Sequence, residues 1–423
     1  MNDFNGLKFH ISGSASENVS NNKLRLVHVF IRKLVNEILK LRGEFVITFG
    51  NEPKQNSSPL IFDYTIMETI NEFYSKIPEN KSLVTSVILY SSHKQKIPKN
   101  RKELYDKFKN NESVRIKVLS YLSSQGGTLR DEISRNSDVL ITLGGLKGVF
   151  NLIEKFNSRK KIIIPLSIDL GTPASSSCIN RLNEGVLKLY PDQFSEQIIT
   201  KINTFCLTQN SDIQNSIEIV LDMLFLLIKG RGEEFINFII RDLKSLQEKN
   251  RAVKPDEDKL SLVFVEFLRR TLKPYGYFAH TQELSGKTSM GYDDQVIHGG
   301  MGELDIRIVD ENNELKHICE AFILTYLDTA NISKHLNKIF DYDINGLPLN
   351  LVIIYAKATD FSSLWQKYLE FLHEFNWKYP LIDSRITDLS KERSCPAEIK
   401  ITLTKHNREG AKCMIYHIFV NLH

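Results

Sequence analysis

The sequence has few cysteines and none of the spacings at which cysteines commonly bind a metal. Only five of its 423 residues are cysteines, and no two of them form a Cys-x-x-Cys pair. Neither a zinc site nor a disulfide framework is therefore indicated, and a reducing cytoplasm is the compartment that fits best. The first residues also lack a basic segment followed by an apolar run, so we expect no signal peptide.

The sequence lacks an apolar run long enough for a membrane span. Its most apolar stretch, residues 217–228, is short and is interrupted by Glu218 and Asp222. A spanning helix needs about 20 predominantly apolar residues. We therefore expect a buried helix in this stretch and no membrane partner.

An excess of charge of one sign is absent too. The 55 lysines and arginines nearly balance the 51 aspartates and glutamates, which leaves a net charge of +4. This value does not identify a nucleic-acid binder, although a local basic face would be sufficient for one. A basic run at residues 94–109 could contact a nucleic-acid backbone. We favour a solvated surface as its interpretation.

What the first half does contain is an alternation of strand-like and helix-like segments. This alternation predicts a parallel sheet with helices on both faces, a Rossmann-like α/β architecture. The expected strands are residues 7–12, 44–49, 83–90, 138–143 and 161–166. The expected helices are residues 23–41, 61–74, 149–156 and 193–205.

The second half begins with helical patterns and ends in a second α/β pattern. Two helices, 213–229 and 233–249, are expected to form a hairpin broken at Gly230-Arg231-Gly232. Later segments predict helices at 259–272, 331–340 and 361–375, and strands at 349–355, 398–404 and 414–420. The predicted division is a first domain at residues 1–207, a helical connector at 208–258 and a second domain at 259–423, since a chain of this length exceeds one core.

Two carboxylates stand out in the second domain. Asp305 lies in the strand-like segment Gly302–Ile308, and Glu320 follows fifteen residues later in the strand-like segment Leu315–Phe322. Polar residues 310–314 between them predict a hairpin turn. Carboxylate ligands from neighbouring strands suit Mg²⁺, and an ion held there could activate water and stabilise charge on a phosphodiester. This is the chemistry of a nuclease.

This region, residues 259–375, resembles the PD-(D/E)xK superfamily, whose fold is that of the restriction endonucleases. The resemblance implies that Asp305 and Glu320 bind Mg²⁺ or Mn²⁺, and that Glu266 is the helix glutamate which many members add to the metal site. Glu303 shares a strand face with Asp305, although a solvent-facing role is favoured for it.

The sequence departs from this superfamily at the lysine of its motif. Phe322 stands two residues after Glu320, on the same strand face, where the lysine is expected. A lysine could orient the attacking water and offset charge in the transition state. Some members supply it from the following helix, where Lys334, His335 and Lys338 share one face. We predict that Lys338 takes this role, with His335 as its neighbour.

In the first domain, two strand-to-helix turns are rich in small residues. The segments are Phe9–Ala15, which contains Ser12-Gly13-Ser14, and Ser137–Gly148, which contains Gly144 and Gly145. Small residues let backbone amides approach a phosphate near a helix N-terminus, where the helix dipole favours anions. Together the two turns predict a nucleotide site.

Residues 6–205 resemble the SLOG superfamily of Rossmann-like nucleotide-binding domains, and most of all the branch found in bacterial antiphage systems. The resemblance implies a pocket that binds an NAD-derived or cyclic nucleotide signal. Its predicted lining residues are Ser12, Gly13, Ser14, Gly144, Gly145 and Lys147. Another SLOG branch contains phosphoribohydrolases, but Val149 and Asn151 replace residues of their motif, which favours a sensor over a hydrolase.

The predicted function is therefore that of a cytoplasmic antiphage-defence effector. We expect a metal-dependent nuclease, regulated by a small nucleotide bound to the first domain, that acts as a homo-oligomer on nucleic acid, with DNA favoured over RNA. Two alternatives remain open. One is a nucleotide or NAD hydrolase acting in the N-terminal domain, and the other is a non-catalytic nucleic-acid-binding adaptor.

Overall fold

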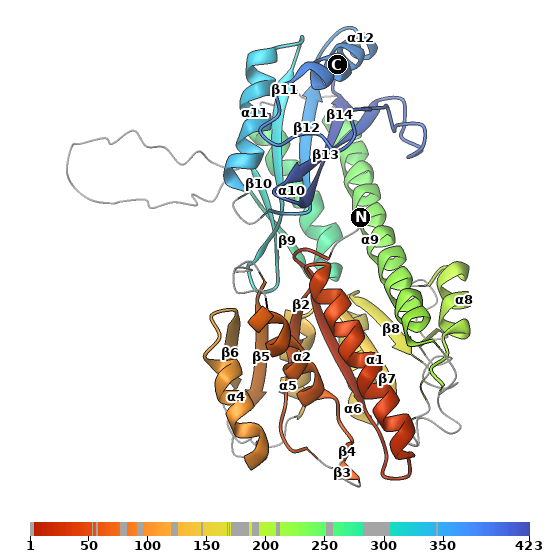
Figure 1. The fold of residues 1–423 in the computed structure, drawn as a ribbon. Helices are drawn as coiled ribbons and strands as arrows, with labels where there is room; N and C mark the ends of the chain where they lie inside the picture. Colours follow the sequence, from red (N-terminus) through yellow and green to blue (C-terminus); the bar gives the residue numbers. More distant parts are fainter. Residues whose placement is uncertain are drawn as a thin grey trace, which may run out of the picture. The chain divides into compact units, whose positions relative to one another are not determined.

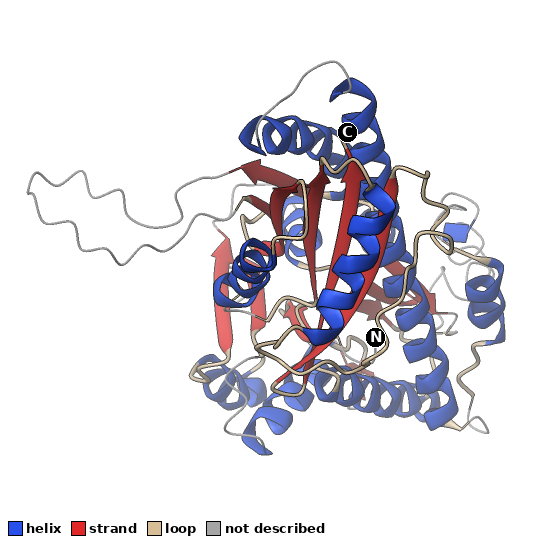
Figure 2. Cartoon of the chain, turned by 90° about the horizontal axis from the view of Figure 1, so that it is seen from above, coloured by secondary structure: helices blue, strands red, loops and turns tan. Residues whose placement is uncertain are grey.

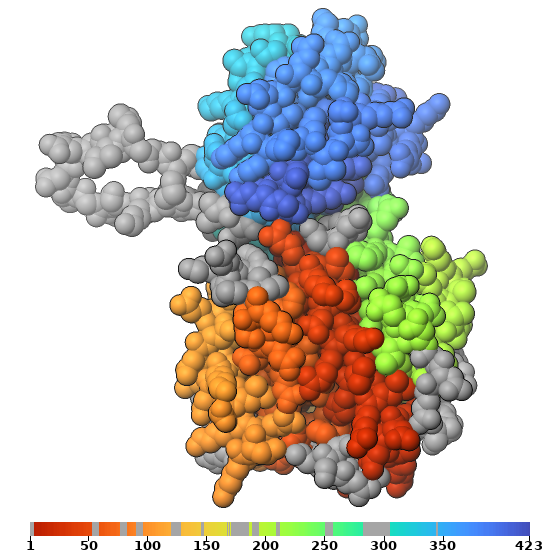
Figure 3. Space-filling model, viewed as in Figure 1, coloured from red at the N-terminus to blue at the C-terminus, as the bar shows by residue number. Residues whose placement is uncertain are grey.

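The computed structural model divides the chain into two compact units, residues 1–231 (unit 1) and residues 232–423 (unit 2). Figure 3 shows one face of the surface, coloured along the chain. The structure describes residues 4–52, 54–55, 58–76, 83–90, 96–119, 126–144, 147–166, 168, 170, 186–187, 194–208, 212–250, 257–281, 305–343 and 346–423. Among these residues, no helix is long and apolar enough to cross a membrane.

Unit 1 contains a parallel six-stranded sheet in the order β6-β5-β2-β1-β7-β8 (Figure 1). Its strands are β1 (Lys8–Ser14), β2 (Glu44–Ile47), β5 (Thr85–Tyr90), β6 (Val114–Leu119), β7 (Val139–Gly144) and β8 (Ile162–Leu166). The chain runs outward from β1 through β6 and then returns to β7, on the other side of β1. The strand order thus reverses between β1 and β7, and the predicted Rossmann-like architecture is confirmed.

Helices accompany the strands of unit 1, and a short hairpin, β3 (Lys54–Gln55) and β4 (Ser58–Pro59), follows β2. The helices are α1 (Asn21–Lys40), α2 (Asp63–Lys76), α4 (Lys102–Lys109), α5 (Gly126–Asn136), α6 (Lys147–Ser158) and α8 (Glu196–Thr204). Helix α1 begins after Ser20, whose hydroxyl accepts a hydrogen bond from the Lys23 amide. Such a cap satisfies one of the free N–H groups of the first turn.

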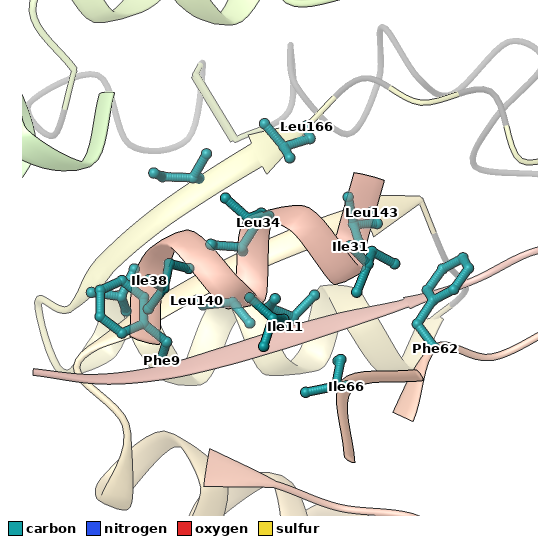
Figure 4. Close-up of a cluster of buried hydrophobic side chains, with 14 of the residues drawn as sticks. Phe9, Ile11, Ile31, Leu34, Ile38, Phe62, Ile66, Leu140, Leu143 and Leu166 are labelled. Carbon is teal, nitrogen blue, oxygen red and sulfur yellow. The ribbon is translucent and has the colours of Figure 1, made fainter. Parts of the chain in front are cut away.

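Apolar residues at helical spacing place α1 against the sheet. Ile31, Leu34 and Ile38 of α1 are fully buried, and they lie near Phe9 of β1 and Leu140 of β7 (Figure 4). The spacing of three and four residues puts these side chains on one face of the helix. Packing of this face holds the beginning of α1 at the end of the sheet where β1 finishes.

The predicted helical hairpin at residues 213–249 is wrong. The structure has one continuous helix, α9 (Ile213–Asn250), of 38 residues. A glycine inside a helix costs only about 1 kcal/mol relative to alanine, and apolar residues on both sides of Gly230 and Gly232 bury the helix. Residues 217–228 belong to the core of unit 1, whereas Phe235–Leu246 belong to a core of unit 2.

Unit 2 contains a mixed six-stranded sheet in the order β13-β14-β12-β11-β10-β9. Its strands are β9 (Tyr277–Thr281), β10 (Ile306–Asp310), β11 (Leu315–Leu324), β12 (Leu349–Ala356), β13 (Ile399–Arg408) and β14 (Ala411–Asn421). Strands β11, β12 and β14 run parallel, and the other pairs are antiparallel. The predicted turn at residues 310–314 joins β10 to β11, with the side chain of Asp310 accepting the amide hydrogens of Asn312 and Glu314.

Helices pack on both faces of this sheet, and Figure 2 shows helices in blue and strands in red. One core contains the second half of α9 and helix α10 (Glu257–Leu272). The other core contains α11 (Thr329–Tyr342) and α12 (Phe361–Glu374). Along β11, Cys319 and Ala321 belong to the first core and Phe322 and Leu324 to the second. A side chain of β11 therefore faces α10 or α11 according to its position in the strand.

Candidate functional site

The C-terminal ends of β1 and β7 lie side by side in unit 1. Ser12, Gly13 and Ser14 pair in register with Thr142, Leu143 and Gly144. In open α/β sheets, ligands bind at the carboxyl ends of the strands where the strand order reverses. The structure thus brings four predicted pocket residues, Ser12, Gly13, Ser14 and Gly144, to this position.

Glycine is required at two of these positions for steric reasons. A Cβ atom at residue 13 would lie 2.2 Å from the carbonyl oxygen of Leu143, and Gly144 has a φ of +61°. The short distance excludes a side chain at residue 13, and the positive φ would strain the backbone of any other residue at position 144. Gly145 lies outside the described residues, and Lys147 begins α6 with no described side-chain position.

A third segment joins this end of the sheet. Ser14 forms an isolated bridge with Ile61, and the Ala15 amide donates to the Leu60 carbonyl oxygen at 2.8 Å. Two residues later Asp63 begins α2. Burial raises the pKa of the Asp63 carboxyl to about 7. Asp63 was not singled out from the sequence, although an acidic residue at the start of a helix is a recognisable signal.

Three side-chain oxygens around β1 are buried without a hydrogen-bond partner in the described part of the chain. They are Asn21 Oδ1 in the first turn of α1, Thr48 Oγ1 just after β2, and Thr142 Oγ1 in β7. Buried polar atoms in proteins nearly always have a partner, which can be a ligand or water. These atoms are therefore candidates for polar contacts with a ligand.

The basic run at residues 94–109 is partly neutralised within unit 1. Arg101 pairs with Glu52 at 2.7 Å and with Glu68, and Lys107 pairs with Glu103 at 2.8 Å. Lys107 is exposed on α4, where such pairs contribute little. These contacts agree with the solvated surface favoured from the sequence.

In unit 2, the structure brings together Asp305, Glu320, His335 and Lys338. Asp305 directly precedes β10, and its Oδ2 accepts the Ala321 amide hydrogen at 2.8 Å. Glu320 lies in β11 with no exposed side-chain surface, and its Oε2 is 3.0 Å from His335 Nδ1 and 3.6 Å from Lys338 Nζ. Helix α11 supplies the histidine and the lysine from the same face, one turn apart.

Electrostatics in this cluster are governed by burial. Burial raises the pKa of Asp305 to about 6, with the nearby Glu320 adding to the rise. Burial also raises the pKa of Glu320 to about 7, against the opposing effect of Lys338. For Lys338 burial lowers the pKa, but Glu320 and Asp305 outweigh it and the net direction is upward. Glu320 Oε1 has no hydrogen-bond partner among the described residues.

Glu266 does not belong to this cluster, so its predicted place in the site needs correction. Its side chain is 53% exposed and lies 3.5 Å from Arg269 and 3.7 Å from Arg270 on the surface of α10. The glutamate that α10 does bring near is Glu257, whose Oε2 accepts the Ile323 amide hydrogen at 3.2 Å. Nine residues separate the two, which places them on opposite faces of a helix with 3.6 residues per turn.

Three ligand groups of the cluster are close enough to share a cation. The ligand atoms of Asp305, Glu320 and His335 all lie within 4.8 Å of one another. The unpartnered Glu320 Oε1 fits such an ion, because a buried carboxylate oxygen is costly without a partner. Glu303 lies outside the described residues. The metal-binding roles of Asp305 and Glu320, and the role of Lys338, stay predictions.

The sheet order, with the carboxyl ends of β1 and β7 side by side where that order reverses, defines unit 1 as a Rossmann-like α/β domain. Residues 4–224 match a protein family described as "ATP nucleosidase Cap17-like, N-terminal", and the chain belongs to this family. Two curated relatives, both named ATP nucleosidase Cap17, come from Escherichia coli strain KTE188 and from Escherichia coli. Each is 29% identical over 167 residues, which cover 38% of this chain and 32% of the relative.

The match therefore spans about a third of the length of these curated relatives. Among solved structures, the molybdenum cofactor carrier protein from Chlamydomonas reinhardtii is similar at 12% identity and a TM-score of 0.28. That comparison covers 52% of this chain and 98% of the carrier protein. A similarity this low supports no inference about the fold or the function of this chain.

The family match contradicts the predicted function of a nuclease regulated by a nucleotide-sensing domain. It favours the alternative that the sequence left open, a nucleotide hydrolase acting in the N-terminal domain. Val149 and Asn151 depart from only one hydrolase motif, whose carboxylate lies on the helix after the glycines. A carboxyl group can come from another element, and Asp63 on α2 is one such group.

Proposed function

We propose that unit 1 binds a nucleoside triphosphate and hydrolyses its N-glycosidic bond, which releases the free base. The observation that carries this proposal is the match of residues 4–224 to the N-terminal region of Cap17-like ATP nucleosidases. Two curated relatives are named for the same activity. The reaction would take place at the carboxyl ends of β1 and β7.

The triphosphate would lie beside Ser12, Gly13, Ser14 and Gly144. These residues lie at the end of β1, and α1 begins seven residues after Ser14. The positive end of the helix dipole favours phosphate at that end of α1. Lys147 begins α6 and stays a predicted residue of this pocket.

Asp63 would act as the general acid. When the bond between ribose C1′ and the base nitrogen breaks, its electron pair leaves with the base, and a proton from Asp63 neutralises that leaving group. Water forms the new C1′–O bond and gives up its proton, which restores the Asp63 carboxyl. Burial raises the pKa of this carboxyl to about 7, so a large share of it is protonated at neutral pH, which general-acid catalysis requires.

The experiment incubates the full chain with ATP and other nucleotides and detects free base and ribose triphosphate by chromatography. We expect base release that Asp63→Asn reduces by about 10² or more. Glu72→Gln, a change to an exposed carboxylate on the same helix, should leave the rate unchanged. Asp305→Ala in unit 2 should also leave it unchanged. No base release from any nucleotide, or release that Asp63→Asn does not alter, would exclude the proposal.

The same assay can test the predicted signal. An NAD-derived or cyclic nucleotide that binds at Ser12–Ser14 would compete with the triphosphate. The antiphage role, the cytoplasmic location, the homo-oligomer and the nucleic-acid partner stay predictions.

A further inference from the structure

We propose that Asp305, Glu320 and His335 hold one divalent transition-metal ion in unit 2, and that Phe322 positions the imidazole for this ion. The mixed set of oxygen and nitrogen ligands would bind Mn²⁺ in preference to Mg²⁺. This proposal concerns unit 2 alone and is independent of the hydrolase proposed for unit 1.

The first support is the geometry of the ligand groups. His335 Nδ1 is 3.0 Å from Glu320 Oε2 and 4.0 Å from Asp305 Oδ2. The three side chains are 9%, 0% and 12% exposed, respectively. Binding through Nδ1 needs the tautomer of His335 that carries its proton on Nε2. A cation would then take the place of a proton between the imidazole and the carboxylate.

The second support is the unpartnered oxygen of Glu320. Its Oε2 has both His335 and Lys338 as neighbours, whereas Oε1 is buried with no hydrogen-bond partner in the described chain. Asp305 raises the pKa of the Glu257 carboxyl, and Glu257 in turn raises the pKa of Glu320. The three carboxyl groups thus lie near one another, and a divalent ion would balance their charge and occupy the unpartnered oxygen.

The third support is the contact between Phe322 and His335. Their rings stack with centroids 4.5 Å apart and an interplanar angle of 22°. Phe322 is itself fully buried in the core formed by α11 and α12. The ring therefore fixes the plane of the imidazole, as supporting residues do for metal-binding histidines. The residue that replaces the motif lysine thus has a positioning role of its own.

The ligand types decide between the two ions. Mg²⁺ prefers oxygen ligands and retains several waters. Imidazole nitrogen adds affinity for ions of the first transition series, among which Mn²⁺ also accepts carboxylates readily. A purely carboxylate pair would not distinguish the two ions in this way, so the preference for Mn²⁺ depends on His335.

The test titrates the full chain with Mn²⁺, follows free Mn²⁺ by electron paramagnetic resonance, and then adds Mg²⁺ as a competitor. We expect one Mn²⁺ per chain, displaced only by at least a tenfold excess of Mg²⁺. His335→Gln should weaken Mn²⁺ binding by about tenfold or more and change Mg²⁺ binding much less. Glu320→Gln should abolish binding of both ions, and Phe322→Leu should weaken Mn²⁺ binding alone.

Matched controls come from exposed residues of the same helices. Lys334→Gln on α11 and Glu266→Gln on α10 should leave both ions unaffected. Pulsed resonance spectra of bound Mn²⁺ in the unaltered chain should show coupling to an imidazole nitrogen, a readout that requires no variant to fold. An absence of tight Mn²⁺ binding, bound Mn²⁺ without nitrogen coupling, or an unchanged Mn²⁺ preference in His335→Gln would each overturn the proposal.

Discussion

His406 and His417 share the hydroxyl group of Thr404 in unit 2, at 2.9 Å and 3.0 Å respectively. The carbonyl oxygen of Tyr379 can only accept, and this determines which atom donates in each hydrogen bond of the chain. Because His406 Nδ1 must donate to the Tyr379 oxygen, its Nε2 accepts from Thr404. Thr404 then accepts from His417 Nε2, and His417 Nδ1 accepts from the hydroxyl of Tyr368. Both imidazoles are neutral in this arrangement.

Acid should therefore destabilise unit 2 through these two histidines. Burial lowers the pKa of His406 to about 4 and that of His417 to about 3. In the unfolded chain both titrate near their ordinary value of about 6.5. Below that value the unfolded state binds protons that the folded state does not. The free energy of unfolding should thus fall as pH drops from about 6.5 to 4, by about 1.4 kcal/mol per pH unit for each imidazole.

The chain offers a specific probe for this measurement. Its two tryptophans, Trp365 and Trp377, both lie in unit 2, so urea unfolding followed by their fluorescence reports on that unit. His417→Gln should be less stable at pH 7 but lose less stability on acidification. Asp305 and Glu320 change the free energy of unfolding in the opposite direction as pH falls. They do so in the unaltered chain and in His417→Gln alike, so the difference between the two slopes does not contain their effect. Equal slopes in the two proteins would contradict the prediction.

Gly13→Ala should destabilise unit 1. The added methyl group would meet the Leu143 carbonyl oxygen at 2.2 Å, and β1 pairs with β7 from Phe9 to Ser14. We expect a loss of about 1–3 kcal/mol, measured by urea unfolding followed by circular dichroism. Gly6→Ala serves as a comparison, because its Cβ would meet nothing within 4 Å although its φ is +77°. A loss in Gly13→Ala no larger than the loss in Gly6→Ala would show that the contact with Leu143 is not a major cost.

Gly232→Ala should stabilise the chain, and so should Gly230→Ala. Both residues lie inside α9, and a Cβ atom at either position would meet nothing within 4 Å. Alanine in a helix interior is more favourable than glycine by about 0.5–1 kcal/mol. Thermal unfolding would show a small upward shift of the transition that involves α9. A downward shift would instead favour the break at these glycines that the sequence suggested.

The N-caps of α11 and α12 allow stability to be separated from metal binding. The Asp328 carboxylate accepts the Asn331 amide hydrogen at 3.0 Å, and Asp360 accepts that of Ser363 at 2.9 Å. Replacement of either aspartate by alanine should cost about 1 kcal/mol. Because α11 carries His335, only Asp328→Ala should also weaken Mn²⁺ binding. Equal binding by the two variants would show that the first turn of α11 does not influence the site.

Much of the fold follows from local patterns in the sequence. The alternation of strand-like and helix-like segments located β1, β7 and β8 to within two residues, and the polar run at 310–314 located the turn after β10. Strand β9 was not predicted, because only pairing with β10 distinguishes Tyr277–Thr281 from a loop. The break predicted at Gly230 failed because burial on both sides of it outweighs the weak helix propensity of glycine.

The site was less accessible to sequence reasoning. Asp305, Glu320 and Lys338 were singled out correctly as a group that lies together, because strand alternation and helical spacing fix their faces. Glu257 was missed because the choice between two glutamates of one helix depends on which face of α10 packs against the sheet. Asp63 was missed for a similar reason, since only the bridge between Ser14 and Ile61 brings α2 beside β1.

Helix α9 determines how the two units could be produced as separate proteins. A fragment that starts at residue 259 would lack Phe235, Ile236, Ile239 and the other apolar side chains of α9 that belong to a core of unit 2. It would expose the apolar surface that they cover and would be prone to aggregate. A fragment that starts at residue 232 keeps these side chains. The useful place to divide this chain therefore lies within α9, at Gly230-Arg231-Gly232, and not between α9 and α10.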